Sequence, residues 1–259
     1  MALEHKDKIR HVVWPRLREV ALPDSRFHYD FSSFIADFQG SDQATERLCS
    51  LPCYKNTQVV FITPDNCLEQ LRFRALCDGK KVLVTTYGIC RGFWLLDPAV
   101  IKTTQQRQLA SLLDAMERPG LGKHITLSEM QSLGLEVELM VTGTGAINYA
   151  GIRFGKGHGF FDLEWAMLTS INVVALSIPC IAIVHDCQLL DEELHPEEFD
   201  TVCDFIVTPT SIYEAGQQGT VHKPSCGILW DKLQPGMLED IPPLRELQIL
   251  QKTKMTLSN

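Results

Sequence analysis

Three glycines at alternate positions mark the segment RFGKGHGFFDLEWAML, residues 153–168, as a candidate for chemistry. Gly155, Gly157 and Gly159 free the backbone to adopt positive φ angles and to approach a ligand closely. Successive N–H groups of such a loop can turn inward and bind an anion. A helix expected to begin near Phe161–Asp162 adds the partial positive charge of its N-terminus. The segment therefore predicts a phosphate-binding loop.

Charged side chains flank these glycines. Arg153 and Lys156 bring full positive charge to the loop, and Asp162 follows it. The G-x-G-x-G spacing fits neither the G-x-G-x-x-G of dinucleotide-binding loops nor the G-x-x-x-x-G-K-[ST] of P-loops. The other interpretation is a tight strand-to-helix turn with Asp162 as the N-cap of the helix. Spacing alone leaves both interpretations open.

The composition limits the partners of such a site. The 259 residues carry a formal net charge of −8 and are 45% hydrophobic, which is typical of a globular protein with a sizeable core. Nucleic acids and anionic membranes attract clustered Lys and Arg, so we expect no autonomous nucleic-acid binding and no membrane association. Nine scattered cysteines without a C-x-x-C pair, and no signal peptide, favour a reduced, cytoplasmic location and disfavour a thiolate metal site.

Short apolar runs that alternate with helical patterns indicate a sheet rich in parallel strands. Strands are expected at 58–64, 81–87, 135–147, 180–186 and 204–209. Helices are expected at 4–20, with a kink or early stop at Pro15, and at 42–54, 66–81, 107–118 and 162–171. We therefore predict an α/β fold, a single three-layer αβα domain with a mainly parallel, Rossmann-like sheet, over residues 1–230, and a peripheral C-terminal arm over 231–259. Residues 142–162 should lie at the carboxyl edge of the sheet, where ligands bind in such folds.

The pattern R-x-G-x-G-x-G-aromatic-aromatic-Asp resembles the signature of the 5-formyltetrahydrofolate cyclo-ligase (methenyltetrahydrofolate synthetase) family, with Phe160-Phe161 where that family usually has Tyr-Tyr. Lys6-x-x-Ile9-Arg10 is similar to its N-terminal K-x-x-[LI]-R helix, and GKKVLV and IAIVHDCQ…FDTVCDFIVTPT follow in the family's order. The form GKGHGFFDLEWAM…IVHDCQ is most similar to a branch of methenyltetrahydrofolate-synthetase-domain-containing proteins. The resemblance spans residues 4–212.

This resemblance implies an enzyme that uses ATP and Mg²⁺. The implied ATP-binding residues are Lys6, Arg10, Arg153, Gly155, Lys156, Gly157, His158, Gly159, Phe160 and Phe161. Arg153 and Asp162 would take part in catalysis, and Asp162 would help to hold Mg²⁺ directly or through water. The implied reaction converts 5-formyltetrahydrofolate, a reduced folate, to 5,10-methenyltetrahydrofolate in one-carbon metabolism, in a monomer or weak dimer.

The substrate side departs from the family's pattern. Asp65 stands where the family has a Glu that helps to hold the pterin, and Phe93 and Trp94, with Tyr87 nearby, could stack on a flat ring. TGTGAI replaces a common PG-x-A-F turn. Two other hypotheses therefore stay open: a paralogue that uses the same ATP site on another heterocycle, and a non-catalytic protein that binds nucleotide or associates with RNA.

Overall fold

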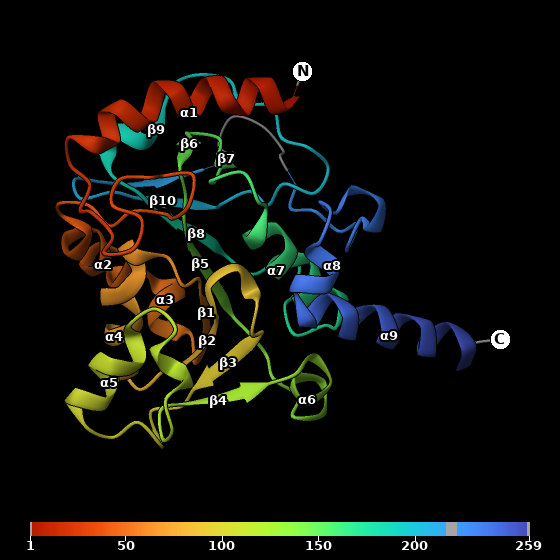
Figure 1. Ribbon diagram of the computed structural model, residues 1–259. Coiled ribbons are helices and arrows are strands. Elements are labelled where there is room, and N and C mark those ends of the chain that lie inside the picture. Colours follow the sequence, from red (N-terminus) through yellow and green to blue (C-terminus); the bar gives the residue numbers. More distant parts are fainter. Residues whose placement is uncertain (1, 216–221, 258–259) are drawn as a thin grey trace.

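A large, mainly parallel sheet forms the centre of the computed structural model, which describes residues 2–215 and 222–257 (Figure 1). The strand order is β11-β10-β8-β5-β1-β2-β3-β4. The neighbours in the row from β10 to β2 pair in parallel, and β3, β4 and β11 add antiparallel edges. Their bounds are β1 Val59–Ile62, β2 Lys81–Thr85, β3 Phe93–Leu96, β4 Gly122–Ile125, β5 Leu139–Gly143, β8 Cys180–Ile183, β10 Phe205–Val207 and β11 Ile212–Glu214. The predicted α/β fold with a mainly parallel sheet is confirmed.

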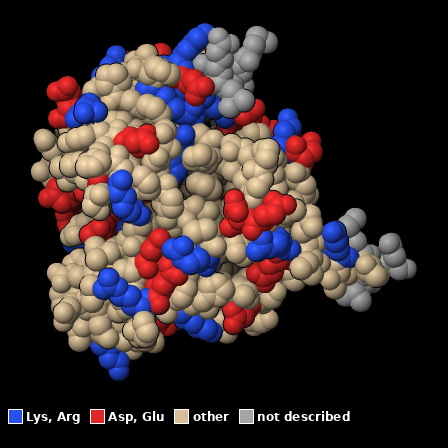
Figure 2. All heavy atoms as spheres, in the orientation of Figure 1, with Lys and Arg blue, Asp and Glu red and all other residues tan. Residues whose placement is uncertain are grey.

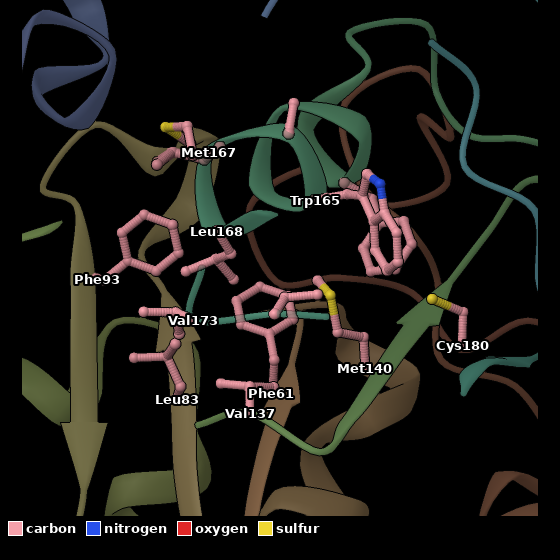
Figure 3. Packing of buried hydrophobic residues seen from close by; sticks show 14 of the residues in the cluster. Phe61, Leu83, Phe93, Val137, Met140, Trp165, Met167, Leu168, Val173 and Cys180 are labelled. Carbon is pink, nitrogen blue, oxygen red and sulfur yellow. The ribbon is translucent and has the colours of Figure 1, made fainter. Parts of the chain in front are cut away.

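Each face of the sheet is covered by helices, because the central strands are apolar on both sides. One face packs against α6 (Leu127–Ser132), α7 (Phe160–Ser170) and α9 (Pro242–Leu257). The other packs against α2 (Ser41–Ser50), α3 (Pro52–Asn56), α4 (Glu69–Cys77) and α5 (Thr104–Ser111). Figure 3 shows Phe61 and Met140 from the sheet meeting Trp165 and Leu168 of α7. Each such buried side chain contributes about 1.5–3 kcal/mol.

A second, three-stranded sheet was not predicted. It consists of β7 (Arg153–Phe154), β6 (Ala146–Asn148) and β9 (Leu189–Leu190), and α1 (Ala2–Arg18) lies beside it (Figure 1). The single strand expected at 135–147 is instead divided between β5 and β6. Two glycines lie where the chain passes from β5 to β6, and close neighbours require them: a Cβ at Gly143 would lie 2.7 Å from Cys67 Sγ and one at Gly145 would lie 2.9 Å from the Phe154 carbonyl oxygen.

Several helix boundaries differ from those expected. The helix expected at 42–54 is divided into α2 and α3, and the helix expected from 66 consists of a turn at Asn66–Leu68 followed by α4. The first helix continues past Pro15 to Arg18. The helix expected at 107–118 is α5, which begins earlier because Thr103 and Gln106 form a capping box, and a separate turn η3 (Ala115–Glu117) follows. The helix expected from 162 begins at Phe160. Helix ends depend on caps and local turns, which hydrophobic periodicity does not report.

The C-terminal residues form α8 (Met237–Asp240) and α9. Ile241, Leu244 and Leu247 are buried in the core beside α7, while the far end of α9 projects from the body (Figure 1). Short turns η1 (Asn66–Leu68), η2 (Tyr87–Ile89), η4 (Asp186–Gln188) and η5 (Trp230–Lys232) complete the elements. Within the described ranges, no helix has the length and apolar character that crossing a membrane requires.

Candidate active site

A cavity of about 380 Å³ opens where the glycine segment meets the carboxyl ends of three neighbouring strands. The segments that follow β1, β2 and β5 form one wall, and the loop between β7 and α7 forms another. Its polar lining includes Lys6, Arg10, Asp65, Thr85, Arg153, Lys156, His158, Asp162, Glu164 and Asp200. The chain thus brings residues from position 6 to position 200 to the edge of the sheet at which ligands bind in parallel α/β folds.

The glycine loop has the conformation of a ligand cradle. Gly157 (φ 113°) and Gly159 (φ 67°) lie in the left-handed region that favours glycine. A Cβ at Gly155 would meet no atom within 4 Å, so the loop leaves open space there. Gly159 is the N-cap of α7 and offers no side chain to the N–H groups of the first turn. Asp162 is therefore not the N-cap, and that interpretation is wrong.

Arg153 and Asp162 form a buried ion pair behind the loop. Arg153 Nη2 lies 2.6 Å from Asp162 Oδ1, and the two side chains are 5% and 11% exposed. The same oxygen accepts the Thr201 N–H at 2.8 Å, and the guanidinium lies 4.4 Å from the centre of the Phe161 ring. Burial alone lowers the pKa of Arg153, but the Asp162 carboxylate and weaker contributions from Asp200 and two cysteines together raise it, so the guanidinium stays charged. Arg153 Nε is buried with no hydrogen-bond partner among the described residues.

Helix α1 brings Lys6 and Arg10 to the loop from one turn apart. Lys6 Nζ lies 2.8 Å from Asp200 Oδ2 and 3.0 Å from Glu197 Oε2. Arg10 donates from Nε to the Gly155 carbonyl oxygen at 3.0 Å, and its guanidinium lies beside Gly157. Arg10 therefore fixes the loop directly. A phosphate that binds Lys6 must compete with two carboxylates.

Lys156 and His158 face the cavity among aromatic rings. Lys156 Nζ donates to the Ser33 carbonyl oxygen at 3.0 Å and lies 4.5 Å from the centre of the Tyr87 ring. His158 is tilted against Phe160 with ring centres 5.3 Å apart. Burial lowers the pKa of both basic groups. All the predicted ATP-binding residues line this cavity.

Asp65 lies in the same cavity, after β1. Its Oδ2 accepts the Thr63 hydroxyl at 2.5 Å and the Gly143 N–H at 2.9 Å, and burial raises its pKa. Phe93 and Trp94 do not line the cavity, contrary to the prediction. On β3, Phe93 packs against Phe61 in the core and Trp94 packs against His124.

Tyr87 lines the cavity as the remaining aromatic candidate. Its hydroxyl donates to the Ser33 carbonyl oxygen at 2.6 Å, and its ring stacks on Phe27 at 5.6 Å between centres. Lys156 and Phe27 therefore already contact this ring. A flat ligand would bind at its edge or would displace one of them.

Two buried charged residues of the site were missed. Glu164 of α7 lines the cavity, accepts the Thr85 hydroxyl at 2.5 Å, and has a pKa that burial raises to about 8. Arg72 of α4 donates from Nη1 to the Thr63 carbonyl oxygen at 2.7 Å and to that of Asp65 at 3.1 Å, so it holds the Asp65 turn. Each is a charged residue within an apolar stretch, which was the available signal.

The described residues do not form a cation site of their own. They contain no cluster of three or more His, Cys, Asp or Glu side chains arranged to hold a metal. The predicted Mg²⁺ ligand, Asp162, already uses Oδ1 for Arg153 and Thr201. On the face drawn in Figure 2, acidic and basic side chains are interspersed over the surface. Positive charge at the cavity therefore comes from side chains that line it, such as Lys6, Arg10 and Arg153, rather than from a basic surface.

Fold and cavity together define an α/β protein with a glycine loop and basic side chains at the carboxyl edge of its sheet. The model of the 5-formyltetrahydrofolate cyclo-ligase family matches residues 2–209, and the chain belongs to this family.

Similar proteins include methenyltetrahydrofolate synthase domain-containing proteins. The human protein is 34% identical over 248 residues, which are 94% of this chain and 61% of the relative, and the protein of Bos taurus is 32% identical with 94% and 62% covered. The chain thus spans about three fifths of the length of these relatives. The NMR structure of Aquifex aeolicus 5,10-methenyltetrahydrofolate synthetase is 15% identical, with a TM-score of 0.49 over 86% of this chain and 99% of that one.

Proposed function

We propose that the chain is an ATP-dependent cyclo-ligase that converts 5-formyltetrahydrofolate to 5,10-methenyltetrahydrofolate. One observation carries the proposal: a single cavity is lined by an open glycine loop with the four basic side chains Lys6, Arg10, Arg153 and Lys156, and by the half-buried Asp65. Membership of the cyclo-ligase family supports an enzyme of this type. We propose cytoplasmic action, on a reduced folate, in a monomer or weak dimer.

The reaction needs positioning more than a protein nucleophile. The formyl oxygen attacks the γ-phosphorus of ATP, and ADP leaves. N10 of the folate then attacks the activated formyl carbon, N10 loses its proton, and the C–O bond breaks to release phosphate. The ring is thereby closed by a new C–N bond.

The glycine loop would receive the phosphates of ATP. Backbone N–H groups of the first turn of α7 point toward the loop, and Arg10 and Lys156 add positive charge. Arg153, whose Nε has no hydrogen-bond partner in the described part of the chain, would stabilise charge that develops on the transferred phosphoryl group. Mg²⁺, when bound, neutralises phosphate charge, and it would enter with ATP because the described residues form no separate site for it.

Asp65 would contact the pterin ring, in place of a longer Glu. An acid that is shorter by one methylene shifts its reach by ~1.5 Å. A misplacement on the order of 1 Å can lower a rate by ~100-fold. We therefore expect measurable turnover that is weaker than in family members with the Glu. This departure also favours the second candidate function, in which the same ATP site serves another heterocyclic substrate.

The first test is turnover. The purified chain with 5-formyltetrahydrofolate, ATP and Mg²⁺ should produce methenyl absorbance, and Asp65→Ala should lower kcat/KM by a further ~10- to 100-fold, because a buried polar contact to the substrate is lost. Asp191→Ala, an exposed acid outside the cavity, should leave turnover unchanged. Full turnover in Asp65→Ala would show that the pterin is held elsewhere. No turnover in the unmodified chain, with ATP binding intact, would favour the other heterocycle.

The variant Gly155→Ala tests whether the glycine loop binds the phosphates of ATP. It places a methyl group in open space, so stability should change by less than about 0.5 kcal/mol. The same methyl would occupy the space of the phosphates, and we expect calorimetry to show at least ~10-fold weaker ATP binding. Gly157→Ala is the contrast, because its φ of 113° should make the fold less stable. Unchanged ATP affinity in Gly155→Ala would show that the phosphates of ATP do not bind at this loop.

A further inference from the structure

Glu164 is an acidic residue of the cavity wall to which the proposed reaction gives no role. It lies in α7 between Leu163 and Trp165, and 1% of it is exposed. The following residues Ala166, Met167 and Leu168 are buried as well. A carboxyl group in so apolar a helix loses its hydration, so its presence requires compensating contacts.

Only one of the two oxygens of this carboxyl group has a hydrogen-bond partner among the described residues. Thr85, at the end of β2, donates its hydroxyl to Oε1 at 2.5 Å. Oε2 is also buried, and among the residues that the structure describes it has no hydrogen-bond partner. If Glu164 only linked α7 to β2, one oxygen would be enough for the hydrogen bond. The second oxygen then has no structural role, and an unpaired buried acceptor destabilises the fold. Glu164 therefore carries a buried, unpaired oxygen next to the cavity that it lines.

Asp65 and Lys156 line the same cavity as Glu164. The Asp65 carboxylate lies close enough to raise the pKa of Glu164, and both carboxylates oppose the fall in the pKa of Lys156 that burial causes. The cavity also has apolar and aromatic lining residues, among them Phe34, Ile89, Phe160, Phe161 and Met237. Flat apolar walls with two carboxyl groups fit a flat heterocycle that has polar atoms along one edge.

We propose that Glu164 is a specificity-determining residue, whose Oε2 forms a hydrogen bond with the nitrogen-rich edge of a fused pyrimidine that binds beside Asp65. The inference rests on the proposed function and names the residue that selects the ring. Ring nitrogens and an exocyclic amino group supply the hydrogen-bonding atoms that Oε2 lacks among the described residues. A site built to pair with such groups discriminates strongly against analogues without them, because its own buried polar atoms are then left unpaired.

The test compares ring binding in three chains. Glu164→Gln keeps the size of the side chain and the oxygen that Thr85 contacts, whereas Glu164→Met removes both oxygens. The probes are 5-formyltetrahydrofolate, pterin, and pteridin-4-one, which lacks the 2-amino group of pterin. ATP is titrated into each chain to check that the cavity is intact, and the exposed Glu136→Gln, outside the cavity, is the matched control.

We expect Glu164→Met to weaken 5-formyltetrahydrofolate and pterin binding by ~10- to 100-fold, with ATP affinity unchanged. Glu164→Gln should weaken binding at least as much, because with its oxygen kept on Thr85 it turns an NH2 donor toward the amino edge of the ring. Loss of the 2-amino group should weaken binding to the unmodified chain and have little further effect in Glu164→Met, because the two changes remove the same contact. If pterin binds all chains with equal affinity, or if Glu164→Met and the loss of the 2-amino group weaken binding independently, the role given to Glu164 is wrong while the proposed function still stands. Failure of the unmodified chain to bind either folate or pterin would overturn the proposed function with it.

Discussion

Replacing Arg153 with methionine is expected to lower the free energy of unfolding by about 3–5 kcal/mol. The guanidinium and Asp162 form an ion pair at 2.6 Å with little exposure of either side chain. Methionine fills the space of the arginine stem but leaves the Asp162 carboxyl group buried without its cation. The Thr201 N–H remains a partner and offsets only part of that loss.

Urea unfolding of single and double variants would measure this effect. Arg107→Met is the control, because Arg107 contacts the Ile101 carbonyl oxygen outside the cavity and should lose less than about 1 kcal/mol. Replacing both partners, in Arg153→Met with Asp162→Leu, should recover most of the stability, since no buried charge is then left unpaired. If Arg153→Met is no less stable than Arg107→Met, the pair contributes nothing to folding.

The ion pair also decides how ATP binding can be tested at this position. A charge reversal such as Arg153→Glu would put two carboxyl groups side by side in the interior, so loss of binding would reflect unfolding. Where Arg153→Met remains folded, its ATP affinity should fall far more than that of Arg107→Met. Calorimetry on protein whose unfolding curve has been checked separates the two causes.

The parallel strands were predictable because they are buried on both faces. VVFI and CIAI read as short continuous apolar runs, and both became central strands. In contrast, β3 and β4 were missed: GKHI of β4 lies at the edge of the sheet with a mostly polar sequence. Its pairing with β3 fixes it as a strand, and that long-range contact leaves no local pattern.

The glycine segment was predictable as a connection from a strand to a helix, although its spacing left open whether it binds a phosphate. Lys6 reaches Asp200 across 194 positions of the chain, a partner that no local pattern reveals. Phe93 and Trp94 were assigned to the substrate because they are aromatic, but β3 packs Phe93 against Phe61 in the core and Trp94 against His124. Type and spacing thus predict the backbone of the loop more securely than the side chains that surround it.

Glu164 should make the protein less stable as the pH rises from 5 to 9. Burial raises the pKa of this carboxyl group from its ordinary 4.5 to about 8, so between these values the folded chain keeps a proton that the unfolded chain has lost. The free energy of unfolding must then fall with rising pH, by ~3–5 kcal/mol once the group is ionised in both states.

Glu164→Gln, which cannot ionise, isolates this contribution. Other groups also titrate in this window, since burial lowers the pKa of His158 and His185 and acts in the opposite direction. The informative quantity is therefore the difference between the two chains. Urea unfolding at pH 5, 6, 7, 8 and 9 should show the unmodified chain losing ~3–5 kcal/mol relative to Glu164→Gln, with most of the change below pH 8. If the free energy of unfolding depends on pH in the same way in both chains, Glu164 ionises in the folded protein as easily as in the unfolded one, and burial does not raise its pKa.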